Sequence, residues 1–205
     1  ELLAPQGEGM AADIVNGILN TRGASLGGLV FGTESADDFI SHARSQGLEA
    51  SDPVPGHGVD EQTGAERRWR NMFWDPAAAR GIFSFCIEHE AGSTLPEAAP
   101  HGAGAIAGVD HVVVKTQSAE AAKAFYGDQL GVRLALEQEV PEWGGVQLFF
   151  RASSMSIEVI VADKAPEQDE LWGLALKSDD IETTHARLTE SDVEVSDIRD
   201  GRKPG

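Results

Sequence analysis

The sequence is poor in cysteine and in positive charge. Cys86 is the single cysteine, so no disulfide can form within the chain, and its apolar surroundings at residues 83–87 predict a small buried side chain in a reducing compartment, the cytoplasm. Lysine and arginine together number 16 against 34 aspartates and glutamates, which gives a formal charge of −18. Because proteins bind nucleic acids by neutralising phosphates with clustered Lys and Arg, no nucleic-acid partner is expected.

Long hydrophobic runs are also missing. The longest apolar stretches, residues 108–114 and 155–162, are far shorter than the roughly 20 residues that a membrane-spanning helix needs, so no membrane partner is expected. Hydrophobic residues make up 41% of the 205, which is enough for a packed core. The chain opens on residues 1–5 without an initiator Met, and we expect this segment to be the end of a strand that begins earlier.

Glycine, alanine and proline gather in residues 92–107, which we interpret as a linker between two domains at 1–91 and 108–205. Before the linker, hydrophobic periodicity predicts a complete module at residues 27–90. Its expected elements are a strand at 28–33, a helix at 36–47, a loop at 52–64, and strands at 68–74 and 82–88.

After the linker the same pattern restarts as a βαβββ unit, a complete module at residues 108–162. Its expected elements are a strand at 109–115, a helix at 118–130 ended by Gly131, and strands at 133–140, 145–152 and 156–161. A partial module at 171–205 follows. It is expected to hold a strand at 171–176, a helix at 180–189 and a strand at 193–197.

An internal repeat supports this division. Displacing the sequence by 145 positions lays residues 28–31 on 173–176 and residues 48–52 on 193–197. A repeat of short structural units is stronger evidence for the architecture than a local sequence pattern. We therefore predict an α+β fold in which repeated βαβββ modules pair into cup-shaped mixed sheets with helices on the outside, and in which residues 1–5 supply the last strand of a preceding module.

Residues 109–114 read Val-Asp-His-Val-Val-Val, and a helix carrying Ala124-Phe125-Tyr126 and ending at Leu130-Gly131 comes next. This sequence resembles the opening of modules in the vicinal oxygen chelate superfamily of glyoxalases, bleomycin resistance proteins and extradiol dioxygenases. The resemblance implies that two modules close into a U-shaped cup. It also implies that a metal, where present, is held by His and Glu or Gln on the first and last strands of the modules.

His111 and Glu158 are the main candidates for a metal site. His111 lies at the start of one strand and Glu158 in the last strand of the same module, each flanked by alternating apolar residues, so both could point into one concavity. An imidazole and a carboxylate suit a divalent metal such as Zn, Fe, Ni or Mn. Such a metal would act as a Lewis acid on vicinal substrate oxygens, although two ligands do not complete a site.

The partner modules are where the sequence departs from the superfamily pattern. The strands that would supply a further ligand hold glycine, at Gly28 and Gly173, and the Glu that would complete the second domain would lie beyond Gly205. Glu1 and Glu88 fill the last-strand positions of the first domain, and they are the weaker metal candidates.

Two functions therefore stay open for this chain. One is a metal-dependent lyase, isomerase or dioxygenase that acts on a small molecule with vicinal oxygens. The other is a metal-free protein of the same fold that binds or sequesters a small molecule. In both cases we expect a small-molecule ligand, and a homodimer or a pairing of modules between chains that covers the open sheet edges. The residues predict neither the substrate nor a catalytic group.

Overall fold

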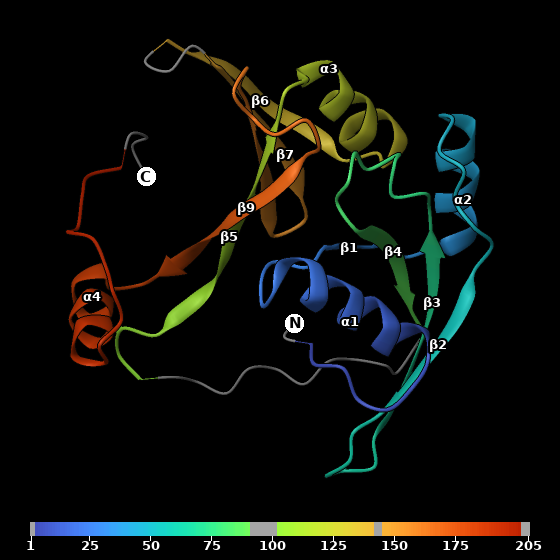
Figure 1. Ribbon diagram of the computed structural model, residues 1–205, viewed down its shortest axis with the longest axis horizontal. Helices are drawn as coiled ribbons and strands as arrows, with labels where there is room; N and C mark the ends of the chain where they lie inside the picture. Colours follow the sequence, from blue (N-terminus) through green and yellow to red (C-terminus); the bar gives the residue numbers. More distant parts are fainter. Residues whose placement is uncertain (1–2, 91–101, 142–144, 202–205) are drawn as a thin grey trace.

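The computed structural model describes residues 3–90, 102–141 and 145–201. These residues form two mixed β-sheets and a small number of helices (Figure 1). The α+β class predicted from the sequence is confirmed. The first sheet has the order β1-β4-β3-β2 and comprises β1 (Leu29–Gly32), β2 (Val54–Val59), β3 (Glu66–Phe73) and β4 (Ser84–His89). The second sheet has the order β6-β7-β8-β5-β9 and comprises β5 (Ile106–Thr116), β6 (Arg133–Val140), β7 (Gly145–Ala152), β8 (Met155–Val161) and β9 (Glu170–Ser178).

The helices are α1 (Met10–Arg22), α2 (Ala36–Ser45), α3 (Ala119–Ala122), the π-helix η1 (Lys123–Gln129) and α4 (Ile181–Glu190). A helical segment follows the first strand of each module, and one further helix, α1, precedes the first module. In each complete module the first strand pairs in parallel with the last one, β1 with β4 and β5 with β8, while the other strands pair antiparallel. Strand β9 then joins β5 in antiparallel fashion, so the first strands of two modules lie side by side. Residues 27–90 and 108–162 therefore share one topology.

A common junction joins the first strand of each module to its helix. A hydroxyl near the strand end accepts a hydrogen bond from the backbone N–H two residues later, and the side chain of that second residue caps the helix. The pairs are Thr33 with Ser35, Thr116 with Ser118, and Ser178 with Asp180. Because Thr33 and Ser178 are 145 positions apart, the internal repeat seen in the sequence corresponds to a repeated structure.

One hydrophobic core extends through both modules. Helices α2 and η1 meet where the modules pack together (Figure 1), and the ring of Trp74 lies 6.1 Å from that of Phe125. At the edge of this core, Arg80 Nε donates to Asp169 Oδ1 over 2.9 Å, and the Asp169 side chain is almost fully buried. Burial of apolar surface by both modules stabilises their relative position.

Two segments near the N-terminus differ from prediction. Residues 3–5 do not form the expected strand, while Glu1 and Leu2 lie outside the described residues. Helix α1 was not predicted, because it carries Gly17 in its interior and has no side-chain cap at Gly9. Ala12 is its one buried residue, so its apolar stripe is too weak to be recognised from the sequence.

Strand β2 lies inside the segment predicted as a loop at residues 52–64. Gly56 and Gly58, which look like strand breakers in the sequence, are required here because the indole of Trp69 on β3 lies across them. A Cβ at Gly56 would overlap that indole. The loop prediction was therefore wrong for Val54–Val59, since cross-strand packing outweighs the local propensity of glycine and proline.

The later elements agree more closely with prediction, with three corrections. The predicted helix 118–130 is divided into α3 and η1, and Gly131 ends it with φ +69° as expected. The predicted strand at 193–197 is wrong, because these residues have no regular secondary structure. Strand β5 starts at Ile106, inside the predicted linker 92–107, of which residues 92–101 lie outside the described part.

Candidate functional site

The two faces of the second sheet differ in chemistry. Alternation along β5 and β8 directs Val112, Val114 and Val159 into the core shared with the helices. The intervening residues, among them His111 and Glu158, project from the opposite face. We call this second surface, which also carries Gln147 and Phe149 of β7 and Gln138 of β6, the site face.

The structure brings together the two main residues predicted for the site. In the parallel register of β5 and β8, His111 lies opposite Ser156, and Glu158 lies opposite Val113, two residues further along. This diagonal relation places His111 Nε2 3.0 Å from Glu158 Oε2. The carboxylate is deeply placed, since Glu158 is only 8% exposed, and the ring of Phe149 stands edge-on to the imidazole at 6.4 Å. A buried carboxylate needs a charged or hydrogen-bonding partner, and His111 supplies one.

Asp110 contacts the other side of the imidazole. Its Oδ2 lies 2.8 Å from His111 Nδ1, and its Oδ1 lies 3.4 Å from Lys177 Nζ on β9. The hydrogen bond from His111, supported by the one from Lys177, lowers the pKa of Asp110 below its ordinary value. A carboxylate on one ring nitrogen fixes the orientation of a histidine and directs the other nitrogen, here Nε2, toward the site face.

Two glutamines hold the second oxygen of Glu158. Gln147 Nε2 donates to Glu158 Oε1 over 2.6 Å, and Gln138 Nε2 donates in turn to Gln147 Oε1 over 2.7 Å. Together with the contacts of His111, these bonds form a polar network that crosses all five strands of the sheet. In strand order from β9 to β6 its members are Lys177, Asp110, His111, Glu158, Gln147 and Gln138.

Sequence reasoning missed four members of this network. Gln147 and Gln138 lie in strands that were predicted with the correct bounds. Gln147 alternates with the apolar Val146 and Leu148, which was a signal that could have found it, whereas Gln138 stands between two glutamates and had none. Asp110 and Lys177 had no such signal. They meet through the antiparallel pairing of β5 with β9, a register that contains bulges and is not visible in the sequence.

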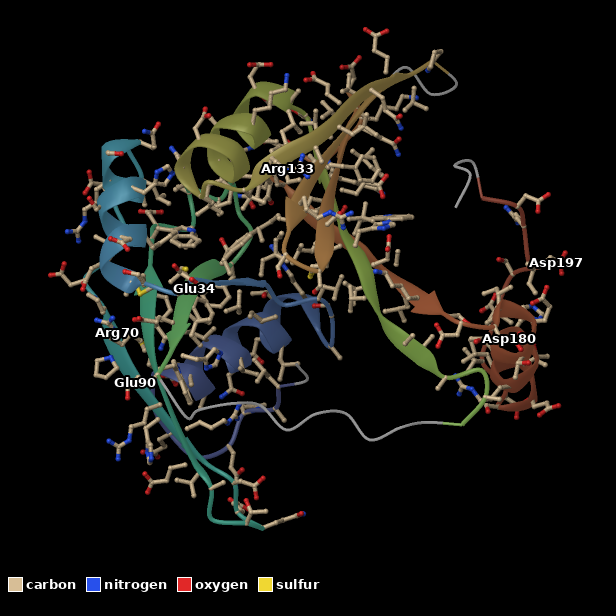
Figure 2. The ribbon with its side chains drawn as sticks, turned by 180° about the vertical axis from the view of Figure 1, so that it is seen from behind. Glu34, Arg70, Glu90, Arg133, Asp180 and Asp197 are labelled. Atoms are coloured by element: carbon tan, nitrogen blue, oxygen red, sulfur yellow. The ribbon has the colours of Figure 1, made fainter. Side chains whose placement is uncertain are left out.

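The weaker metal candidate Glu88 does not join this site. Glu1 lies outside the described residues. Glu88 is opposite Arg70 in the first sheet, on the same side as the buried Cys86, and Arg70 Nε donates to Glu88 Oε2 over 2.6 Å. Figure 2 labels Arg70 on this sheet, well away from the second one. In the part of the chain that the structure describes, no group of three or more His, Cys, Asp and Glu side chains is arranged to hold a metal ion.

The strand–helix junctions define which residues correspond between modules. His111 lies five residues before Thr116, and the matching positions before Thr33 and Ser178 are Gly28 and Gly173. The residue that corresponds to Glu158 in the first module is Phe85, because Phe85 is opposite Val30 as Glu158 is opposite Val113. The first module therefore has a glycine and a phenylalanine where the second has a histidine and a carboxylate.

These two glycines have different surroundings. A Cβ on Gly28 would overlap the backbone carbonyl and ring of Phe83, so no larger residue fits there without rearrangement. A Cβ on Gly173, which is opposite Val113 in the second sheet, would meet no atom within 4 Å. The second sheet thus has free space where a further ligand side chain could stand, and the first sheet does not.

The residues present fit part of a divalent metal site. Imidazole and carboxylate are suitable ligands, and both have the outer partners, Asp110 and Gln147, that usually orient such ligands. A complete site needs at least one more protein ligand, and among the described residues no third His, Cys, Asp or Glu is arranged with these two to hold a metal. His111 and Glu158 therefore supply two ligands of a metal site but not a complete set.

No helix in the described residues is both long and apolar enough to cross a membrane.

A scan against protein families matches residues 110–205 to the Glyoxalase/Bleomycin resistance protein/Dioxygenase superfamily. No curated protein sequence matches the chain.

Solved structures that match with a TM-score above 0.5 share the fold. A triple mutant of 4-hydroxymandelate synthase from Streptomyces coelicolor matches with a TM-score of 0.53 and 16% identity, over 87% of this chain and 56% of that one. A hypothetical protein from Staphylococcus aureus matches with a TM-score of 0.52 and 8% identity, over 78% of this chain and 64% of that one. Methylmalonyl-CoA epimerase from Mycobacterium tuberculosis matches with a TM-score of 0.41 and 21% identity, over 47% of this chain and 73% of that one. The chain thus spans about three fifths of the length of the first two proteins.

Proposed function

We propose that the site face binds a small molecule with vicinal oxygens at a divalent metal held in part by His111 and Glu158. The match of residues 110–205 to the Glyoxalase/Bleomycin resistance protein/Dioxygenase superfamily supports this proposal. The observation that carries the proposal is the 3.0 Å approach of His111 Nε2 to Glu158 Oε2 on a face turned away from the core. Zn, Fe, Ni and Mn are the metals suited to this donor set. The reaction would be a lyase, isomerase or dioxygenase reaction.

The chain's own residues would prepare this site in defined ways. Asp110 fixes the imidazole of His111 so that Nε2 faces the ligand, and Gln147 holds one oxygen of Glu158 so that the other is presented beside Nε2. When bound, a metal would supply Lewis acidity toward the substrate oxygens. The ring of Phe149, edge-on to His111, covers one side of the pair.

The competing function is metal-free binding of a small molecule by the same face. It is favoured by Gly173, which stands at the position of a partner-module ligand. It is also favoured because no three His, Cys, Asp and Glu side chains among the described residues are arranged to hold a metal. In that case the His111–Glu158 pair would be a hydrogen-bonding element of a binding cup. The two functions differ in one measurable property, metal stoichiometry.

Metal content and metal titration separate the two. Elemental analysis and calorimetric titration with Zn²⁺, Mn²⁺, Ni²⁺ and anaerobic Fe²⁺ should give near-stoichiometric binding that His111→Ala or Glu158→Gln weakens at least tenfold. The matched control is the pair His57 and Glu66, an exposed histidine and glutamate 3.4 Å apart in the first module. His57→Ala and Glu66→Gln should leave metal binding unchanged. If wild-type protein binds none of the four metals, the metal-dependent function is wrong.

A gain-of-function variant tests the geometry independently. Because a Cβ at Gly173 meets no atom within 4 Å, Gly173→His can be accommodated and would place an imidazole across from β5. We expect it to tighten metal binding at least tenfold, with the gain lost when His111 is also replaced. Gly108→His is the control, because Gly108 also has free space and lies on the same sheet.

We also propose that modules pair between copies of the chain as a homodimer. Strand β1 is at the edge of the first sheet, whereas the corresponding strand β5 is covered by β9. Val30 on β1 is 55% exposed, and an open edge of this kind favours pairing with another strand. Sedimentation of the chain should show a dimer that Val30→Lys weakens; a monomer at all concentrations would refute the pairing.

A further inference from the structure

Two arginines lie directly opposite each other on the site face. Arg133 of β6 pairs in register with Arg151 of β7, Arg151 pairs with Ser156 of β8, and Ser156 pairs with His111 of β5. Cross-strand partners project from the same face of a sheet. The two guanidinium groups and the imidazole therefore belong to one row of side chains. Figure 2 labels Arg133 where the second sheet meets the helices.

This arrangement brings two positive charges together, and a bound anion would balance them. Like charges on directly opposed residues destabilise a pair of strands. Carboxylates are abundant in a chain of net charge −18, and Arg44, Arg70 and Arg80 each contact one. Within the described residues, the side chains of Arg133 and Arg151 form no hydrogen bond or ion pair, and both residues are exposed.

We propose that Arg133 and Arg151 bind an oxyanion, a carboxylate or a phosphate, on the ligand of the site face. The inference rests on the proposed small-molecule function of that face and specifies its substrate class. Arginine presents several N–H donors in a planar fork that matches carboxylate and phosphate oxygens, and two such groups side by side can hold one anion. Binding would also relieve the repulsion between the two arginines.

The register also sets the size of the ligand. Arg151 and His111 are separated by one intervening strand, so their backbones are about two inter-strand spacings, about 10 Å, apart. Ser156 stands between them and offers a hydroxyl. A ligand that contacts both ends would carry its anionic group several bonds away from the oxygens near His111 and Glu158.

The test uses inorganic phosphate and acetate as probes of the whole chain at constant ionic strength, with chloride as reference. Binding is followed by the Arg Nε–Hε signals in NMR and by the rise in Tm. We expect millimolar binding of at least one probe to the wild type, weakened at least tenfold by Arg133→Gln or Arg151→Gln. The two probes separate phosphate from carboxylate recognition. Arg199→Gln, the same change of charge outside the sheets, should bind like the wild type.

A second readout does not depend on the anion. In chloride, Arg151→Gln should have a higher Tm than the wild type because the repulsion is removed, whereas Arg199→Gln should not. Equal probe binding by all variants, or no binding of either probe to the wild type, would overturn the proposal. Metal titration of the wild type distinguishes the two hypotheses: a wild type that binds metal but neither probe sinks the oxyanion site alone, and one that binds a probe but no metal sinks the metal site alone.

Discussion

Replacing Tyr126 by alanine tests whether the two modules form one cooperative unit. Tyr126 is 2% exposed, and its ring lies 6.5 Å from Phe31 of the first module and 5.4 Å from Phe150 of the second. Truncating a buried aromatic residue to alanine costs about 3–5 kcal/mol. Because Tyr126 contacts both modules, we expect a loss of about 4 kcal/mol in the free energy of unfolding, a large share of the roughly 5–15 kcal/mol that a domain has.

The assay measures unfolding of the first module in urea, although the substituted residue, Tyr126, belongs to the second module. Trp74 belongs to the first module, and its ring lies 6.1 Å from Phe125. In a background with phenylalanine at Trp69, Trp143 and Trp172, fluorescence reports on Trp74 alone, and far-UV circular dichroism reports on the whole chain. In Tyr126→Ala the unfolding midpoints of both signals should move together to lower urea concentration, because one core links the modules.

Tyr126→Phe is the matched control. It keeps the ring that fills the core and removes the hydroxyl, which burial keeps protonated by raising the pKa of Tyr126. We expect a change of less than about 1 kcal/mol. An unchanged Trp74 midpoint in Tyr126→Ala, together with a separate earlier transition in circular dichroism, would show that the modules unfold independently and that the shared core adds little stability.

Three further predictions concern single residues. Burial raises the pKa of the Cys86 thiol to about 12, so at pH 8 its reaction with a disulfide reagent should be about a thousandfold slower in the native protein than in denaturant; a comparable native rate would contradict its burial. The lowered pKa of Asp110 means that its contribution to stability is complete above about pH 5 and is lost as the pH falls below its ordinary value near 4. Urea titrations should therefore show that Asp110→Asn loses less stability than the wild type when the pH is lowered. An identical dependence of stability on pH in the two proteins would refute the contact with His111. Gly56→Ala should lower Tm because its methyl group would overlap Trp69, whereas Gly58→Ala, which has more room, should lower it less.

Periodicity in the sequence predicted the second module almost residue by residue. Strands β6 and β7 have the predicted bounds, because apolar residues recur along both and turn residues flank them. Strand β2 and helix α1 were missed for the opposite reason. Their glycines have a local preference against regular structure, and only the contact with Trp69 or the packing beside the first sheet makes these conformations favourable.

The candidate site could be predicted in part. His111 and Glu158 were recognisable because each is a polar residue at a defined place in a predicted strand, and the structure places their side chains in contact. Lys177 was not recognisable. It reaches Asp110 through a strand pairing with several register shifts, and the position of such bulges depends on the packing of the whole sheet.

The difference between the two modules indicates where chemistry can occur. At corresponding positions, the second module has His111 and Glu158, and the first has Gly28 and Phe85. In the first module the ring of Phe83 packs against Gly28 and lies 5.6 Å from Phe85, so apolar contacts occupy the place of a polar pair. Burial of these rings adds stability but offers no ligand atom. The same topology therefore serves packing in one module and presents a histidine and a carboxylate in the other, which places the candidate site in the second module.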